Sequence, residues 1–103
     1  MKFITTSISL SMITSSNYEL SIDEINKEQF ENETYDGYSC VGYQDIADKL
    51  NVAYNKEAVK ARPGDELYVA NLQQGTLKYY RIRVFEKPRL ENKKLEEGMV
   101  EWF

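Results

Sequence analysis

RPGDELYVANLQQ, residues 62–74, is the stretch of sequence that decides the fold. Its Pro63 suits the first corner of a tight turn, and its Gly64 suits the second corner. The run that follows, residues 66–72, has apolar side chains on both faces of a strand. Such a pattern is typical of a central strand that is covered on both sides. We therefore expect this strand in the interior of a sheet.

Strand periodicity appears on either side of this stretch. Apolar and polar side chains alternate with a period of two, which predicts three more strands, at residues 3–10, 18–25 and 77–85. The last strand places Tyr79, Arg81 and Arg83 on one face. A basic and aromatic face favours stacking of a base on tyrosine and pairing of a phosphate with arginine. The alternative is a like-charged edge strand that resists aggregation.

The clearest helix is predicted to follow Gly42. Ile46, Ala47 and Leu50 fall at helical spacing, and Asp45 lies in the first turn, where it complements the helix dipole. A further helical turn is expected around residues 25–30.

The order of these elements predicts an α/β fold of the α+β kind. We expect a small mixed β-sheet flanked by helices, in a single domain that spans residues 1–103. Residues 89–103 form a C-terminal extension to this domain. Its apolar end either folds back onto the core or docks a partner. The apolar side chains are Met99, Val100, Trp102 and Phe103.

The composition removes several chemistries. The 103 residues include no histidine and one cysteine, Cys40, so an internal disulfide and a Cys/His zinc site are both excluded. Cys40, beside Val41, is expected as a small core residue. No phosphate-binding loop, dinucleotide fingerprint or catalytic triad is present. We therefore assign no catalytic residue, no metal and no cofactor.

Charge is divided unevenly along the chain, whose formal net charge is −4. Residues 1–55 carry nine acidic and three basic side chains, whereas residues 56–103 carry eight acidic and ten basic ones. The overall acidity argues against duplex nucleic acid, but the basic half favours a small anionic ligand. No apolar run is long enough to cross a bilayer, and the hydroxyl-rich N-terminus does not suit a signal peptide. We therefore expect a cytoplasmic location.

Three segments together resemble a known family. They are SISLSMI at residues 7–13, CVGYQDIA at residues 40–47, and the stretch 59–74. In the order and spacing of these segments the chain resembles the small viral ring nucleases, anti-CRISPR proteins of archaeal viruses with relatives in phages and integrative elements. The resemblance implies a small mixed sheet flanked by helices, a homodimer, and a cleft for cyclic oligoadenylate, which active members degrade.

The chain departs from that family at two places in the implied site. Members that cleave carry Gly-His at the entrance of the ligand-binding helix, with the histidine as general acid, whereas this chain has Gly42-Tyr43. Tyrosine, with a pKa of about 10, is a much weaker acid at neutral pH. The family's Gln-Arg after the central strand is Gln74-Gly75 here, so an arginine that contacts phosphate is missing.

Candidate ligand-binding residues follow from the pattern and from the resemblance. The resemblance implies ligand contacts at Ser9 and Gln74, and the helix entrance offers free backbone N–H groups to a phosphate. The alternatives are an ordinary helix start with Tyr43 packed against the sheet, and a solvated strand face for the hydroxyls. The candidates are Thr6, Ser9, Ser11, Gly42, Tyr43, Gln44, Gln74, Arg81 and Arg83.

Three functions fit these observations. The first is a non-catalytic anti-defence protein that sequesters a cyclic nucleotide signal or blocks a defence component of the host. The second is a protein-binding inhibitor of a CRISPR effector, without nucleotide affinity, whose acidic N-terminal half mimics nucleic acid. The third is a slow ring nuclease with Tyr43 as its acid. The expected partners are a cyclic oligonucleotide or a host defence protein, together with a second copy of the chain, and neither a membrane nor duplex nucleic acid.

Overall fold

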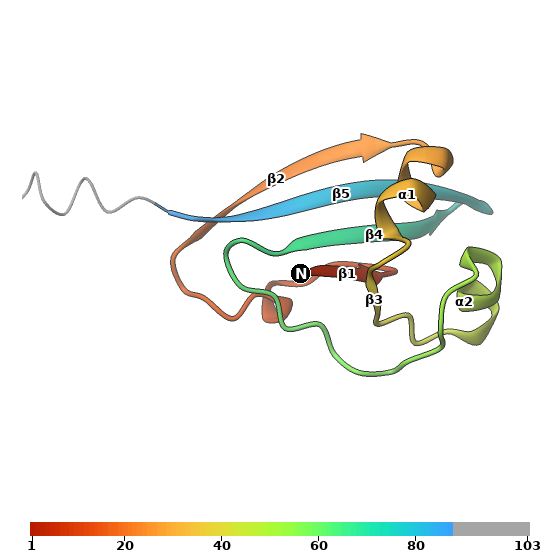
Figure 1. Cartoon of the computed structure of the whole chain (residues 1–103), viewed down its shortest axis with the longest axis horizontal. Helices are drawn as coiled ribbons and strands as arrows, with labels where there is room; N and C mark the ends of the chain where they lie inside the picture. Colours follow the sequence, from red (N-terminus) through yellow and green to blue (C-terminus); the bar gives the residue numbers. More distant parts are fainter. Residues whose placement is uncertain (88–103) are drawn as a thin grey trace, which may run out of the picture.

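Five strands form one mixed sheet in the computed structural model, which describes residues 1–87 (Figure 1). The order of the strands across the sheet is β2-β5-β4-β1-β3. The elements in chain order are β1 (Lys2–Thr5), the 3-10 helix η1 (Leu10–Met12), β2 (Tyr18–Ile25), α1 (Lys27–Thr34), β3 (Tyr38–Ser39), α2 (Gln44–Leu50), β4 (Glu66–Gln73) and β5 (Thr76–Glu86). The predicted α+β fold, with its small mixed sheet and flanking helices, is confirmed.

The central strand β4 lies where the sequence predicts it. It pairs in parallel with β1 and antiparallel with β5, and β3 continues the parallel pairing beyond β1. The turn before it is closed by a hydrogen bond from the Asp65 amide to the Arg62 carbonyl at 2.9 Å, and Gly64 has a φ of 102°. The hairpin to β5 turns through Gln74 and Gly75, both at positive φ, as two-residue hairpin loops require.

Two local predictions are wrong in their extent. The N-terminal strand ends at Thr5 instead of residue 10, because the chain leaves the sheet and forms η1. Alternation misled there because Ile8 and Leu10 are exposed and not packed on a sheet face. The predicted turn at residues 25–30 is a longer helix, from Lys27 to Thr34. Asn26 caps its N-terminus, because its side chain accepts a 2.7 Å hydrogen bond from the backbone amide of Gln29.

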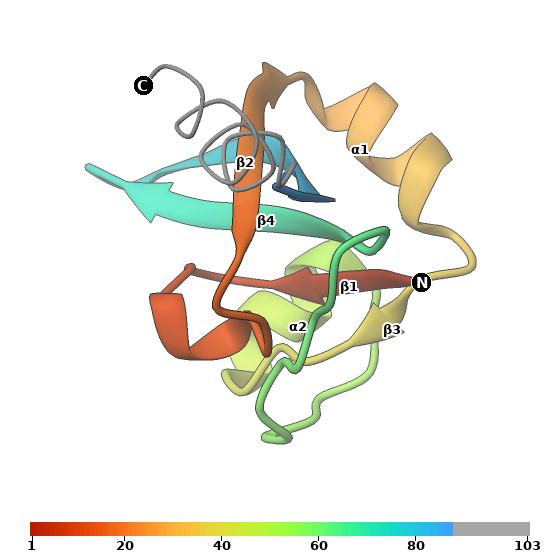
Figure 2. The same cartoon turned by 90° about the vertical axis from the view of Figure 1, so that its left-hand side faces the viewer.

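The two faces of the sheet are covered by different material, as Figure 2 shows with α1 and η1 on opposite sides. The helices cover the first face, which we call the helix face; its core includes Ile4, Phe30, Val41, Ala47 and Tyr68. Loops cover the second face, which we call the loop face; its core includes Phe3, Ile13, Cys40, Ala61, Leu67, Ile82 and Val84.

Cys40 is buried, as predicted for a small core residue. Burial raises the pKa of its thiol, so the thiol stays protonated at neutral pH. Among residues 1–87 no helix is long and apolar enough to cross a membrane.

Candidate functional site

The parallel pairing of β1, β3 and β4 brings the ends of these strands to one edge of the sheet. The segments that follow the three strands therefore lie close together, as in other sheets with parallel strands. The Asn71 side-chain amide joins two of these segments by donating a 2.9 Å hydrogen bond to the carbonyl of Thr6. We call the region where these segments begin, made of residues 6–7, 42–44 and 71–75, the carboxyl edge. The chain then turns away from this edge, and η1 lies on the loop face, where Met12 accepts a 2.7 Å hydrogen bond from the Ala61 amide.

Most of the predicted site residues belong to the carboxyl edge. Gln44 is exposed at the start of α2 and donates a 2.9 Å hydrogen bond to Asp48 one turn later. The candidates on this edge are Thr6, Gly42, Tyr43, Gln44 and Gln74. Ser9 and Ser11 flank η1 outside this edge; both are exposed, and their hydroxyl groups lie 2.9 Å apart.

Tyr43 does not pack against the sheet. Its side chain is 62% exposed and lies directly before α2, which begins at Gln44 and has seven residues. The alternative in which Tyr43 packs against the sheet is therefore wrong. On the neighbouring Gly42, an added Cβ would make ordinary van der Waals contact with the Lys56 side chain at 3.5 Å.

Arg81 and Arg83 lie apart from the other candidates. The hairpin places Gln73 opposite Thr76 at the carboxyl edge, whereas Arg83 lies opposite Glu66, at the other end of β4. The side chains of Arg81 and Arg83 share the helix face with Tyr79, as their spacing predicts. That face is covered at Tyr79, which is buried against the Phe30 ring at a centroid distance of 4.9 Å.

Both arginines are paired with carboxylates of the same chain. Arg81 Nη1 donates to the two carboxylate oxygens of Glu33 at 3.0 and 3.2 Å, and its Nη2 lies 3.5 Å from Asp23. Arg83 Nε lies 3.7 Å from the carboxylate of Glu66. The hydrogen bond with Glu33 raises the pKa of Arg81. The alternative of a like-charged edge strand is wrong, because β5 lies between β2 and β4 and is not an edge strand. Binding of a ligand phosphate by the two arginines stays a prediction.

Glu33 is the centre of a polar cluster that the sequence did not reveal. Its carboxylate accepts hydrogen bonds from the Tyr68 hydroxyl at 2.9 Å and from the side-chain amide of Gln29 at 3.0 Å, in addition to those from Arg81. The hydrogen bond from Gln29 is the largest cause of the lowered pKa of Glu33. Burial is the largest cause of the raised pKa of Tyr68. The cluster therefore holds α1 against β4 and β5. In the sequence, only the four-residue spacing of Gln29 and Glu33 on one helix indicates any of these contacts.

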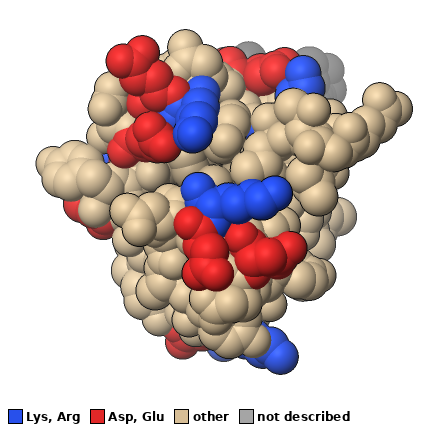
Figure 3. Space-filling model, turned by 90° about the vertical axis from the view of Figure 1, so that its right-hand side faces the viewer, with Lys and Arg blue, Asp and Glu red and all other residues tan. Residues whose placement is uncertain are grey.

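Large apolar side chains are exposed on the same carboxyl edge. Tyr43 is 62% exposed and Leu72 is 50% exposed on this edge, and Leu10, which is 75% exposed, lies outside it on η1. Figure 3 views the molecule from this end: most of the surface is uncharged, and basic side chains adjoin acidic ones. The edge therefore combines apolar side chains with hydroxyl and amide groups.

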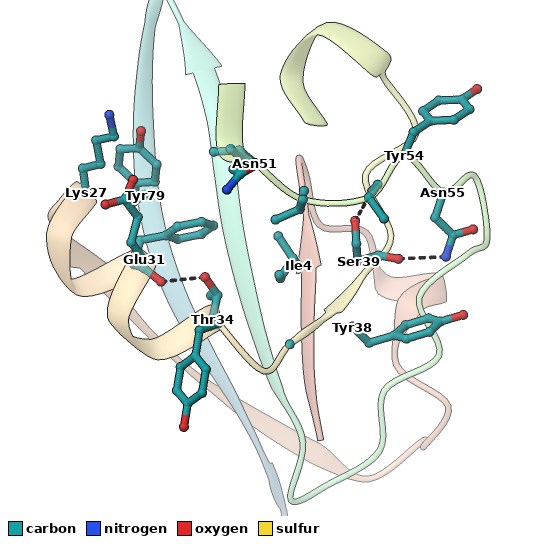
Figure 4. A pocket seen from close by; sticks show the side chains of 16 residues that line it. Ile4, Lys27, Glu31, Thr34, Tyr38, Ser39, Asn51, Tyr54, Asn55 and Tyr79 are labelled. Carbon is teal, nitrogen blue, oxygen red and sulfur yellow. Dashed lines mark hydrogen bonds between the residues drawn. The ribbon is translucent and has the colours of Figure 1, made fainter. Parts of the chain in front are cut away.

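A separate groove lies on the helix face, between α1 and the segment after α2 (Figure 4). Its volume is about 830 Å³, and Ile4, Phe30 and Tyr79 contribute to its lining. Lys27 and Glu31 also line it, from α1. None of the predicted site residues lines this groove. Within residues 1–87, no group of His, Cys, Asp and Glu side chains is arranged to hold a metal ion.

Comparison with known proteins places the fold. No family model matches the sequence, and no curated protein matches it. Among solved structures, the chain is similar to B116 of Sulfolobus turreted icosahedral virus, with a TM-score of 0.71 and 16% sequence identity. The similarity covers 80% of this chain and 97% of that chain. At this identity the likeness shows a shared fold, and that fold occurs in a virus of Sulfolobus.

Proposed function

We propose that this chain is a virus-associated, non-catalytic anti-defence protein that binds and blocks a protein component of host defence through its carboxyl edge. The likeness to B116 of a Sulfolobus virus supports the association with viruses. The resemblance of segments 7–13, 40–47 and 59–74 to viral ring nucleases supports a role against host defence. The exposed apolar surface at the edge supports a protein as the partner.

The exposed side chains at the edge carry this proposal. Tyr43 and Leu72 would each bury apolar area against a partner, at roughly 1.5–3 kcal/mol for each large side chain. Uncharged interface centres with tyrosine and aliphatic side chains are typical of protein contacts. Arg81 and Arg83, the expected phosphate ligands, are paired with carboxylates and lie away from this edge.

Sequestration of a cyclic nucleotide is a second candidate function, favoured by the polar groups of the same edge. Gln44 and Gln74 offer exposed side-chain amides, and a homodimer would supply a second set. A cyclic oligonucleotide would then be held by hydrogen bonds and not by arginine.

Two measurements on the purified chain test these functions. Isothermal titration against cyclic oligonucleotides, cyclic oligoadenylates included, should give no heat, and heat with any of them would support sequestration. A pull-down from host lysate should recover a protein with the wild-type chain and lose it with the Tyr43→Ser variant. The matched control is Tyr35→Ser, which changes a tyrosine that is 85% exposed outside the carboxyl edge. Equal recovery with Tyr43→Ser would contradict the proposed surface.

A further inference from the structure

One strip of the loop face is left open. It consists of Tyr18, Leu20 and Ile22 on β2 together with Tyr80 on β5, which we call the open strip. Leu20 lies opposite the buried Val84, and Ile22 lies opposite the buried Ile82, so these side chains share the loop face. Ile22 is nevertheless 60% exposed, and the other three are partly buried.

The strip is open because the loops cover only the other half of this face. Ile13 and Ala61, which join the two covering loops, pack with Phe3 of β1 and Leu67 of β4. Within residues 1–87, β2 is an edge strand with no further strand beside it, and the aliphatic side chain of Ile22 faces solvent. Apolar side chains in a row on an edge strand mark a surface that something covers.

The chain emerges from the described structure beside this strip. Glu86 lies opposite Tyr18 at the end of β5. The next residue, Lys87, donates its amide to the Asn17 carbonyl at 3.2 Å and accepts a 3.1 Å hydrogen bond from the Asn17 side chain. Lys87, the last described residue, therefore lies at the Tyr18 end of the open strip.

We propose that the apolar end of the same chain, residues 99–103, docks on the open strip. This end carries Met99, Val100, Trp102 and Phe103, which match the strip in apolar character. The strip spans four residue steps of β2, or about 13 Å. The eleven residues from 88 to 98 can extend over roughly 36 Å, so they allow the chain to reverse and reach Ile22.

Docking within one chain is favoured over docking on a partner. The tether keeps the segment at an effective concentration of millimolar order, whereas a second copy must reach that concentration in solution. This docking is independent of the carboxyl edge, because Tyr43 and Leu72 do not belong to the strip. Failure of this proposal would therefore leave the proposed function unaffected, and failure of the proposed function would leave this proposal unaffected.

Trp102 provides a direct test, because it is the chain's one tryptophan. In the full-length wild-type chain its fluorescence should be shifted to shorter wavelength, and protected from acrylamide, relative to the chain unfolded in denaturant. Ile22→Asp should move both readouts to the unfolded values while the far-ultraviolet circular dichroism is kept. Ile22→Thr, which keeps a β-branched residue in the strand, should give an intermediate shift.

The control is Leu72→Ser, an exposed leucine outside the strip, which should leave the fluorescence of Trp102 unchanged. Wild-type emission equal to that of the unfolded chain would overturn the proposal, as would emission that neither Ile22 variant changes. Emission that depends on protein concentration would assign the strip to a second copy and would also overturn docking within one chain.

Discussion

Arg81 on β5 donates from Nη1 to both carboxylate oxygens of Glu33 on α1, at 3.0 and 3.2 Å. The two residues are 48 positions apart in the sequence. The Arg81 side chain is 18% exposed, so the charge that the sequence offered to a ligand phosphate is used inside the fold. A guanidinium held in this way stabilises the position of α1 on the sheet.

Glu33→Gln should lower the free energy of unfolding by about 1–2 kcal/mol, because it leaves the Arg81 guanidinium without its charged acceptor. Chemical denaturation monitored by circular dichroism measures this change. Glu31→Gln is the matched control on the same helix, since no hydrogen bond or ion pair of the Glu31 side chain is present in the described part of the chain. The control should change the free energy by less than about 0.5 kcal/mol. Equal effects of the two substitutions would contradict the role of Glu33.

The contribution of Glu33 should depend on pH in one direction. Its pKa is lowered in the folded chain, chiefly by the hydrogen bond from Gln29, and the hydrogen bonds from Tyr68 and Arg81 add to this. Its stabilisation is therefore complete above the unfolded pKa of about 4.3 and is lost as the pH falls through the lower, folded value. The difference in unfolding free energy between wild type and Glu33→Gln should shrink below about pH 4.3. A difference that stays constant between neutral pH and pH 3 would contradict the lowered pKa.

Gly64→Ala should destabilise the fold by about 1–2 kcal/mol, because Gly64 has a φ of 102°, which L-amino acids rarely adopt. The cost is conformational, since an added Cβ at this position meets no atom within 4 Å. Gly42→Ala is the control, because its Cβ would make only ordinary contacts and its φ is not in the left-handed region. Thermal melts of both variants measure the difference, and equal melting temperatures would contradict the argument.

Tyr43→Phe should leave any cleavage of cyclic oligoadenylate unchanged, because the proposed function assigns no proton transfer to this hydroxyl. The measurement is product formation at neutral pH by wild type and variant, followed by chromatography. Cleavage by wild type that the variant loses would instead support a slow ring nuclease with Tyr43 as the acid.

Truncation after Arg89 should leave the domain folded, because all strand pairings of the described sheet lie within residues 1–87. The removed residues lie outside the described part of the chain. The sequence by itself predicts that their loss weakens dimerisation or partner binding, whereas docking within one chain predicts a lower melting temperature and an unchanged oligomeric state. Thermal melts and analytical ultracentrifugation of the truncated chain distinguish the two. A truncated chain that keeps its melting temperature, its oligomeric state and its partner would make the extension dispensable.

Local patterns were sufficient where one segment alone sets the structure. The alternation of residues 18–25 predicts β2 with its observed bounds, and the two-faced apolar run of residues 66–72 predicts the interior strand β4. The turn at residues 62–65 follows from its Pro-Gly pair. The strand predicted over residues 3–10 failed beyond Thr5, because alternation is present whether or not a partner strand continues alongside.

By itself, the sequence determined the α+β class, the interior strand and the exclusion of histidine chemistry, because composition and short-range periodicity decide these. Only the tertiary structure decided that Arg81 pairs with Glu33, that Tyr43 is exposed, and that Asn71 of β4 holds the segment at Thr6. These relationships join segments far apart in the chain. Burial and charge pairing between such segments depend on how the sheet is assembled, and no local pattern records that assembly.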